Sequence, residues 1–244
     1  MLRLAAKIAL QKTSLIDFPG CISSVFFFPG CNLRCPWCHN RELVIGEAKS
    51  LVELEDGLAH LRKRKAVLGG VVLSGGEPCL YNELPELIAE IKKLKLFRQD
   101  EQLLVKLDTN GMFPFMLEKL FTREETRPDY IALDLKVAPA RYAELLPAAG
   151  SFDPAEALIR SAALIRHSGI NHEFRTLALP GGHITEKDIE ALAPLAGNSP
   201  WFFRPFRGGN CLDPSWNNLG NPDGEDAARG LAAKARELGK TVLS

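Results

Sequence analysis

Three cysteines in one short stretch are the sequence feature with the clearest chemistry. Cys31, Cys35 and Cys38 lie within eight residues, in the stretch GCNLRCPWCHN, directly after an apolar run at 21–28. Clustered thiols bind a metal, form a disulfide or carry out redox chemistry. A structural zinc site takes four ligands, commonly from two separate knuckles, and the sequence has no second Cys-x-x-Cys. Three thiolates without a fourth favour a four-iron cluster with one iron open to a substrate.

The composition favours metal binding over a disulfide. The chain has 244 residues, and its 30 Lys+Arg against 30 Asp+Glu provide no basic field for nucleic acid. No apolar stretch approaches the roughly 18 residues of a membrane span, and the N-terminal MLRLAAKIALQK lacks a signal-peptide core. We therefore expect a cytoplasmic protein without membrane contact, whose thiols stay reduced. The solitary Cys21, Cys79 and Cys211 are predicted to be small buried apolar side chains.

Short strand patterns alternate with helix patterns along the chain. The predicted strands are apolar runs bounded by Gly, Pro, Asn or Asp, at residues 22–28, 70–73, 103–107, 130–135, 173–179 and 201–206. A capping box at 50–53 predicts a helix that begins near Leu51. An apolar stripe from Leu84 to Leu94 predicts another, and Asp153-Pro154 and residues 185–188 open two more. The last predicted helix runs from about Asp223 to Leu238, with Gly239 to end it.

Alternating strands and helices indicate parallel strands joined by right-handed crossovers. Six such units are too few for a closed eight-unit barrel. We expect an α/β fold, a partial (β/α)6 barrel with parallel strands, formed by a single domain over residues 1–244. A doubly wound sheet is the alternative, because the pattern is the same for both.

Polar and glycine-rich motifs follow every predicted strand at the same end. They are the cysteine stretch, then residues 74–78, 108–111, 134–136, 175–182 and 204–210. In a parallel α/β fold these strand ends converge on the face where ligands bind. The clustering predicts one active site that uses all six units.

Two of these motifs together resemble a known superfamily. Cys31-x-x-x-Cys35-x-x-Cys38 resembles the cluster-binding signature of the radical S-adenosylmethionine superfamily, and Gly75-Gly76-Glu77-Pro78 resembles its methionine-binding motif. The stretches at 11–20, 38–40, 108–111 and 134–136 resemble glycyl-radical-enzyme activating proteins. Residues 206–214 are similar to the branch that activates anaerobic ribonucleoside-triphosphate reductase.

The resemblance implies a cofactor and a reaction. In that family the three thiolates hold a [4Fe–4S] cluster, whose fourth iron is chelated by S-adenosyl-L-methionine. Reductive cleavage then gives methionine and a 5′-deoxyadenosyl radical, which takes a Cα hydrogen from a glycine of a partner enzyme. The implied cofactor-binding residues are His39, Asn40, Gly75, Gly76, Glu77, Asp108, Thr109, Asp134, Lys136, Arg175 and Arg207.

Individual roles follow from the same resemblance, with alternatives left open. His39 and Asn40 are implied to lie beside the adenine, although His39 can equally make an ordinary hydrogen bond to a neighbouring group. Glu77 is implied to be a hydrogen-bonding residue rather than a general base. Arg175 sits on an apolar strand, where it needs an anion or an acceptor nearby.

A monovalent cation is a further expectation. Asp108, Thr109 and Asp134 resemble residues that coordinate such an ion beside the cofactor carboxylate in pyruvate formate-lyase activating enzymes, and hard oxygen ligands suit it. The alternative is that Asp108 caps a turn and Asp134 pairs with Lys136. Both are retained at this point.

The expected partner enzyme depends on one difference from pyruvate formate-lyase activating enzymes. Pyruvate formate-lyase activating enzymes have a histidine in the last strand-end loop where this chain has Arg207. This supports a glycyl radical enzyme of the anaerobic ribonucleoside-triphosphate reductase type as partner, with flavodoxin or ferredoxin as reductant. The alternatives are a radical enzyme acting on a small molecule and a non-catalytic iron–sulfur or zinc module. The module would not explain the other strand-end motifs.

Overall fold

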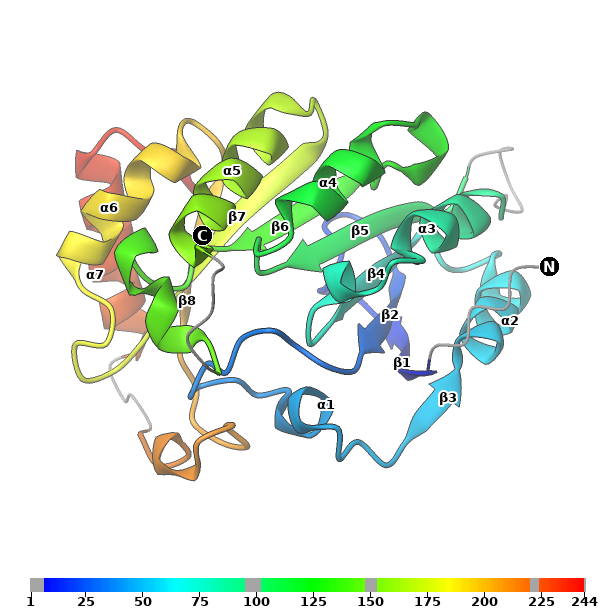
Figure 1. Cartoon of the computed structure of the whole chain (residues 1–244), viewed down its shortest axis with the longest axis horizontal. Coiled ribbons are helices and arrows are strands. Elements are labelled where there is room, and N and C mark those ends of the chain that lie inside the picture. Colours follow the sequence, from blue (N-terminus) through cyan, green and yellow to red (C-terminus); the bar gives the residue numbers. More distant parts are fainter. Residues whose placement is uncertain (1–6, 95–101, 148–152, 220–223, 244) are drawn as a thin grey trace. The chain divides into compact units, whose positions relative to one another are not determined.

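The chain divides into two compact units. Figure 1 labels the helices and strands. The computed structural model describes residues 7–94, 102–147, 153–219 and 224–243. The first unit comprises residues 1–31, 42–109 and 115–131, and the second unit comprises residues 32–41, 110–114 and 132–244. Strand β6 (Tyr130–Asp134) contributes residues to both units. That residues 1–244 form a single domain stays a prediction.

The first unit is built on a sheet with the strand order β3-β1-β2-β4-β5. Strand β1 is antiparallel to β2 and β3, whereas β2, β4 and β5 are parallel. The start of β6 lies beside β5, because Asp129 N donates to Val105 O at 2.8 Å. The strands are β1 (Lys7–Ser14), β2 (Ser23–Phe28), β3 (Leu51–Glu53), β4 (Gly70–Gly75) and β5 (Leu104–Thr109).

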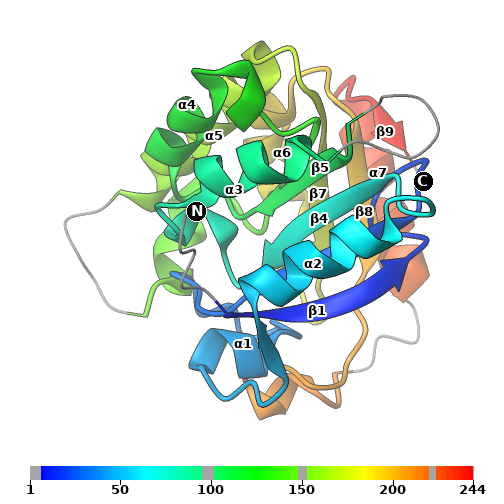
Figure 2. The ribbon, with the colours of Figure 1, turned by 90° about the vertical axis from the view of Figure 1, so that its right-hand side faces the viewer.

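The helices that lie mostly in this unit are α1 (Arg41–Ile45), α2 (Leu54–Arg64), α3 (Leu84–Lys92) and α4 (Pro114–Phe121). Among them, α3 contacts β5. Figure 2 shows α2 lying alongside β1. A Cβ on Gly57 of α2 would lie 2.9 Å from side-chain atoms of both Ile8 and Phe26, so only glycine permits this approach of the helix to the sheet.

The expected helix start near Leu51 is wrong. Residues Leu51–Glu53 form strand β3, in which Val52 pairs with Ile8 of β1, and helix α2 begins at Leu54. Glu53 occupies the N-cap position without a side-chain capping bond. Pairing with an edge strand thus prevails over a local capping pattern, which is a weak preference of about 1 kcal/mol.

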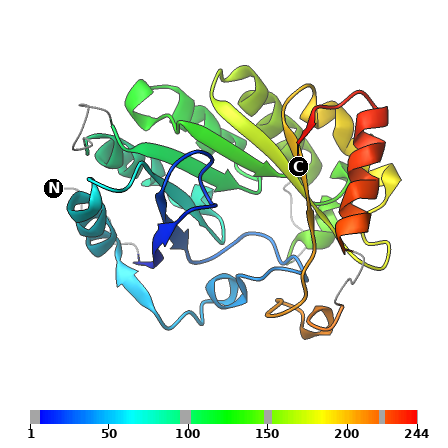
Figure 3. The same cartoon turned by 180° about the vertical axis from the view of Figure 1, so that it is seen from behind.

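The second unit contains the parallel strands β7, β8 and β9, and Leu135 N, just after β6, donates to Arg175 O of β7 at 2.8 Å. Figure 3 shows α7 beside β8. The elements are β7 (Asn171–Ala178), β8 (Trp201–Pro205), β9 (Val242–Leu243), α5 (Pro154–His167), α6 (Glu186–Ala196) and α7 (Gly224–Glu237). Short 3-10 turns lie at Pro78–Leu80, Glu124–Thr126, Pro139–Leu145 and Pro214–Trp216.

Three predicted helix boundaries are confirmed here. Asp153 caps α5 by accepting from the backbone N–H groups of residues 155 and 156, and Thr185 forms a capping box with Asp188 at the start of α6. Gly239 has φ +73° after the last turn of α7, and its N–H donates to Arg236 O at 2.8 Å. Asp223, the expected start of the last helix, lies outside the described residues.

All six predicted strands are confirmed, as β2, β4, β5, β6, β7 and β8. The sequence reading missed β1, β3 and β9, the outer strands. The predicted α/β class with mostly parallel strands is confirmed, and β3 and β9 end the strand order. Within the part of the chain that the structure describes, no helix is long and apolar enough to cross a membrane.

Candidate functional site

The cysteine loop begins where β2 ends. Gly30 turns the chain with φ +84°, and the loop then carries Cys31, Cys35 and Cys38, none of which forms a disulfide. Cys31 belongs to the first unit and the other two to the second. Among the described residues, no three His, Cys, Asp or Glu side chains form a ready-made metal site. The donor chemistry nevertheless fits an iron–sulfur cluster, because three unbridged thiols follow one another on a single loop.

In the second unit, the cysteine loop is hydrogen-bonded to the loop after β8. Leu212 N donates to Cys38 O and Asp213 N donates to Pro36 O, each at 2.9 Å. These bonds join two stretches that are far apart in the sequence. Both stretches are motifs that follow predicted strands. The loop after β8 therefore orients the backbone that carries two of the three thiols.

Aromatic rings reinforce the same contact. Trp37 lies 5.4 Å from Trp216, measured between ring centroids, and both side chains are buried. His39 stacks on Phe206 at 5.7 Å, and its Nε2 lies 2.7 Å from Arg207 O. The hydrogen-bond alternative for His39 is thus present in the structure. Its contact with an adenine stays a prediction, as does that of Asn40.

The side chain of Arg207 belongs to an arginine-lined pocket of about 400 Å³ between β8 and α7. Arg204, Arg229 and Arg236 also line this pocket, and Glu225 is its acidic residue. The backbone carbonyl of Arg207 meets His39, as described above. That Arg207 binds the cofactor stays a prediction.

In the first unit, the glycine-rich loop after β4 packs against the start of the cysteine loop. Gly76 N donates to Phe28 O at 2.8 Å, and Glu77 N donates to Gly30 O at 2.9 Å. Gly75 has φ +120°, and a Cβ there would lie 2.3 Å from Phe28 N. Only glycine fits such a backbone contact. The glycine-rich loop therefore contacts the main chain directly before Cys31, the first cysteine of the signature.

Glu77 is fully buried and organises its surroundings by accepting hydrogen bonds. Its Oε1 accepts from Cys79 N at 3.0 Å and from Thr109 Oγ1 at 2.9 Å. Burial, and then the Glu77 carboxylate, raise the pKa of the Cys79 thiol well above its ordinary value, against a lowering by Thr109. Cys79 thus stays a protonated thiol, which is a poor iron ligand. Glu77 has the hydrogen-bonding position that the sequence indicated.

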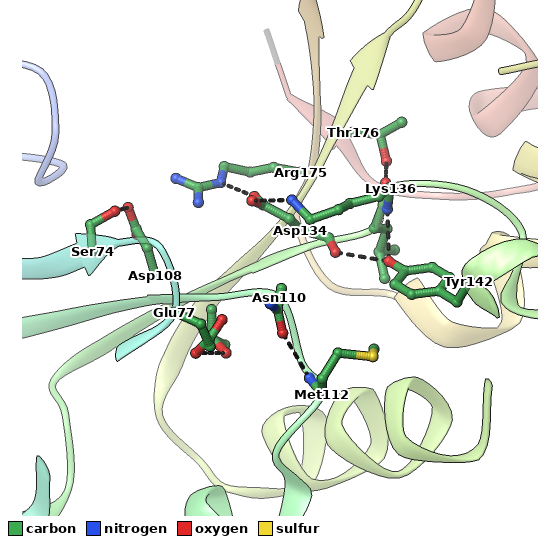
Figure 4. Close-up of polar contacts among 12 residues, drawn as sticks. Ser74, Glu77, Asp108, Asn110, Met112, Asp134, Lys136, Tyr142, Arg175 and Thr176 are labelled. Atoms are coloured by element: carbon green, nitrogen blue, oxygen red, sulfur yellow. Dashed lines mark hydrogen bonds and ion pairs between the residues drawn. The ribbon is translucent and has the colours of Figure 1, made fainter. Parts of the chain in front are cut away.

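Asp108 is held by two neighbours on the sheet of the first unit. Ser74 Oγ donates to Asp108 Oδ2 at 3.1 Å (Figure 4). Lys106 Nζ lies 2.5 Å from Asp108 Oδ1. The turn predicted at Asp108 is instead made by Asn110, whose Oδ1 accepts from Met112 N at 3.0 Å. Asn110 lies in the second unit, where its Nδ2 also donates to Asn32 Oδ1 at 2.9 Å.

Asp134 is held by two cations in the second unit. Arg175 Nε donates to its Oδ1 at 2.9 Å and Lys136 Nζ donates to its Oδ2 at 3.0 Å (Figure 4). Burial raises the pKa of Asp134, but the positive charges of Arg175 and then Lys136 lower it by more. The net pKa of Asp134 lies well below the ordinary value. The pairing with Lys136 is confirmed, and Asp134 is the acceptor that Arg175 needed.

Lys136 connects this group to the cysteine loop. Burial lowers its pKa, but Asp134 and then the Cys35 sulfur raise it, and the net pKa lies above the ordinary value. Lys136 N also donates to Tyr142 Oη at 2.8 Å. The charged side chain of Lys136 therefore interacts electrostatically with the sulfur of Cys35.

Each aspartate is therefore paired within its own unit: Asp108 with Lys106 and the Ser74 hydroxyl, and Asp134 with Lys136 and Arg175. That these aspartates bind a monovalent ion stays a prediction. Sequence reasoning placed Ser74 in the motif at 74–78 without a role, and it missed Lys106 and Tyr142. Of these two, only Lys106 left a signal, as a charged residue inside the apolar run LLVKLD.

Comparison with known proteins agrees with this geometry. Residues 25–196 match the Radical SAM superfamily. Over 231 residues the chain is 28% identical to a protein of Methanocaldococcus jannaschii provisionally named a glycyl-radical enzyme activating enzyme, covering 93% of this chain and 87% of that protein. It is 31% identical over 132 residues to the pyruvate formate-lyase-activating enzyme of Clostridium pasteurianum, covering 52% of this chain and 51% of that enzyme.

A solved structure shares the fold. A radical SAM methyltransferase from Sphaerobacter thermophilus has a TM-score of 0.62 at 18% identity, covering 95% of this chain and 68% of that one. The family match over residues 25–196 includes both the cysteine loop after β2 and the glycine-rich loop that contacts its start. The chain belongs to the radical SAM superfamily of enzymes, which use a [4Fe–4S] cluster and S-adenosylmethionine.

Proposed function

We propose that this protein is a radical SAM activase of a glycyl radical enzyme. In this proposal Cys31, Cys35 and Cys38 hold the [4Fe–4S] cluster. The observation that carries it is the main-chain contact between Gly76–Glu77 and Gly30, which fixes the glycine-rich loop beside the first cysteine. When bound, the cluster and S-adenosylmethionine supply the 5′-deoxyadenosyl radical that removes a glycine Cα hydrogen.

The residues of the chain have distinct roles in this proposal. The backbone of Gly75 and Gly76, which is half-buried, is proposed to receive the methionine end of the cofactor. Glu77 fixes that loop by accepting from Cys79 N and Thr109 Oγ1. In the second unit, the Lys136 ammonium interacts electrostatically with the Cys35 sulfur.

Residues of the second unit are proposed to contact the adenine and the polar end of the cofactor. His39 and Asn40 lie on the cysteine loop and are proposed to contact the adenine. Arg175 and Lys136 fix Asp134 in one orientation, so that its carboxylate is preorganised for the polar end of the cofactor. Preorganisation matters because the sulfonium must be held against its electron donor for reduction.

The proposed partner is anaerobic ribonucleoside-triphosphate reductase. The support is the stretch FRGGNCLDP at 206–214 and its hydrogen bonds to the cysteine loop. The 93% coverage of this chain by the methanogen relative supports an activase as the broader class. Flavodoxin or ferredoxin is the proposed reductant.

Anaerobic electron paramagnetic resonance tests this proposal. Reconstituted protein is mixed with S-adenosylmethionine, dithionite and a purified anaerobic ribonucleotide reductase. The expected result is a glycyl doublet on the reductase and one 5′-deoxyadenosine per doublet formed. Cys35→Ala should give neither, whereas Cys21→Ala, which removes a thiol outside the motif, should give both.

The other outcomes separate the parts of the proposal. Deoxyadenosine without a doublet, with this reductase and with pyruvate formate-lyase, would overturn the activase function and favour a small-molecule substrate. A doublet on pyruvate formate-lyase alone would keep the function and replace the partner. Neither product from a fully loaded cluster would overturn the proposal entirely.

A further inference from the structure

Lys106 is a charged residue buried in the middle of a strand. Its side chain is 2% exposed, and it pairs in register with Val72 of β4, so it shares a face of the sheet with an apolar neighbour. Removing an ammonium from water is costly unless the charge is compensated. A buried lysine at such a position therefore requires a permanent anionic partner.

Asp108 is that partner, and it is engaged at both oxygens. Lys106 Nζ lies 2.5 Å from Oδ1, while Ser74 Oγ donates to Oδ2 at 3.1 Å. Lys106 and Asp108 are two residues apart on β5, so both side chains project to the same face of the strand. The geometry of the strand therefore places the Lys106 ammonium beside the Asp108 carboxylate.

A soluble cation would compete for the same carboxylate. The resemblance noted above expects Asp108 and Thr109 to ligate a monovalent ion, but the ammonium already neutralises Asp108, and like charges repel in a buried site. The Thr109 hydroxyl is directed at Glu77, to which it donates at 2.9 Å. The first unit therefore offers a mobile ion a carboxylate that is already paired.

We propose that Lys106 is a built-in cation, which takes the place of a soluble Na⁺ or K⁺ at Asp108 and makes cofactor binding independent of monovalent salt. Its link to the cofactor rests on the proposed function. Lys106 is in this view a positioning residue: it fixes the orientation and charge of Asp108 and does not touch the reacting atoms. A tethered ammonium is present at every salt concentration, whereas an ion has to be captured from solution.

The test compares cofactor binding in two salts of equal ionic strength. Reconstituted holoprotein is titrated with S-adenosylmethionine in tetramethylammonium chloride, whose cation is too large for the site, and in potassium chloride. The wild-type Kd should differ by less than about twofold between the two salts. Lys106→Met should bind about tenfold more weakly in tetramethylammonium and recover to within about threefold of wild type in potassium.

A matched control is available in the same unit. Lys92 is also a buried lysine, 9% exposed, whose Nζ lies 3.0 Å from Asp129 Oδ1. Lys92→Met removes a comparable ion pair away from Asp108, and it should leave the Kd insensitive to the choice of salt. A salt dependence in Lys92→Met equal to that of Lys106→Met would overturn the inference, since any lost ion pair would then cause it.

A second readout does not depend on the cofactor. The ²³Na line width should be broadened by Lys106→Met, or by Lys106→Gln if the first variant does not fold, and not by wild type. Sodium broadening by wild type, a wild-type Kd that weakens tenfold without potassium, or a lysine variant that is insensitive to both salts would each overturn the inference. If no protein binds S-adenosylmethionine in either salt, the proposed function fails, and the sodium line widths still decide whether Lys106 replaces an ion.

Discussion

The backbone of Gly76 lies so close to that of Gly30 that a Cβ on Gly76 would be 1.8 Å from the Gly30 carbonyl oxygen. This is far inside van der Waals contact, and the obstructing atom is main chain that cannot rotate away. The contact ties the glycine-rich loop after β4 to the residue that precedes Cys31. Two motifs separated by more than 40 residues thus depend on a glycine for their contact.

Gly76→Ala should therefore destabilise the protein by about 3 kcal/mol, the upper part of the range for overpacked interiors. It should also reduce the iron content after reconstitution, because the start of the cysteine loop has to move. Urea unfolding and iron analysis measure the two effects. Gly230→Ala is the control: its added Cβ meets no atom within 4 Å, and replacing glycine within helix α7 should stabilise by about 0.5–1 kcal/mol. Equal stability of the two variants would contradict the tight contact.

The buried carboxylate of Glu77 gives a second prediction. Glu77→Ala should destabilise by about 3 kcal/mol, since two buried donors lose their acceptor at about 1–3 kcal/mol each. Glu77→Gln keeps an amide oxygen that can accept from Cys79 N and Thr109 Oγ1, so its loss should be about 1 kcal/mol. Chemical unfolding of both variants separates a hydrogen-bonding role from a requirement for charge. A Gln variant as unstable as the Ala variant would contradict the hydrogen-bonding role.

Iron loading should distinguish the three cysteines of the motif from Cys79 and Cys211. Ala variants of Cys31, Cys35 or Cys38 should each lose most of the iron taken up on reconstitution, while Cys79→Ala and Cys211→Ala should retain it. Both of those thiols are buried, and burial raises their pKa, which disfavours the thiolate that binds iron. Iron analysis with the visible absorbance of the cluster provides the measurement. Loss of iron from a folded Cys79→Ala or Cys211→Ala protein would contradict the assignment.

Asp188 should determine part of the acid stability. Burial raises its pKa, but hydrogen bonds from Ala138 N, from Thr185 N and Oγ1, and from Arg141 outweigh burial and lower it overall. A carboxylate with a lowered pKa stabilises the fold above its unfolded pKa, about 3.9, and that contribution is lost as the pH falls through the folded pKa.

Asp188→Asn should therefore cost about 2 kcal/mol at pH 7, the value of hydrogen bonds to a charged acceptor. The difference from wild type should shrink as the pH is lowered below about 4. Urea unfolding at pH 7, 5 and 3 checks this. A difference that stays constant down to pH 3 would show that the charge of Asp188 contributes nothing.

The Asp134 group should give a smaller effect. Its side chain is 35% exposed, so solvent screens its pairs with Lys136 and Arg175. Asp134→Asn should cost only about 1 kcal/mol in unfolding free energy for this reason. Cofactor binding should weaken more than stability does, because the same change releases the orientation of Arg175. Isothermal titration with S-adenosylmethionine compares the two effects, and intact binding would argue against a site at Asp134.

The sequence by itself determined the strands β2, β4, β5, β6, β7 and β8 and the motifs that follow them. Their signals are local: a buried parallel strand is an apolar run, and a tight backbone contact requires glycine at a fixed position. The spacing of Cys31, Cys35 and Cys38 is likewise a local property. None of these features depends on a distant residue.

Only the tertiary structure decided which charges are paired. Ser74 and Asp108 are 34 residues apart, and Asp134 and Arg175 are 41 apart, so no local pattern could predict that each aspartate is already engaged. Strand β3 also depends on a distant partner. Its residues have the sequence pattern of a helix cap, but they form a strand because they pair with β1. Chain folding brings such partners together, and burial then makes their pairing obligatory.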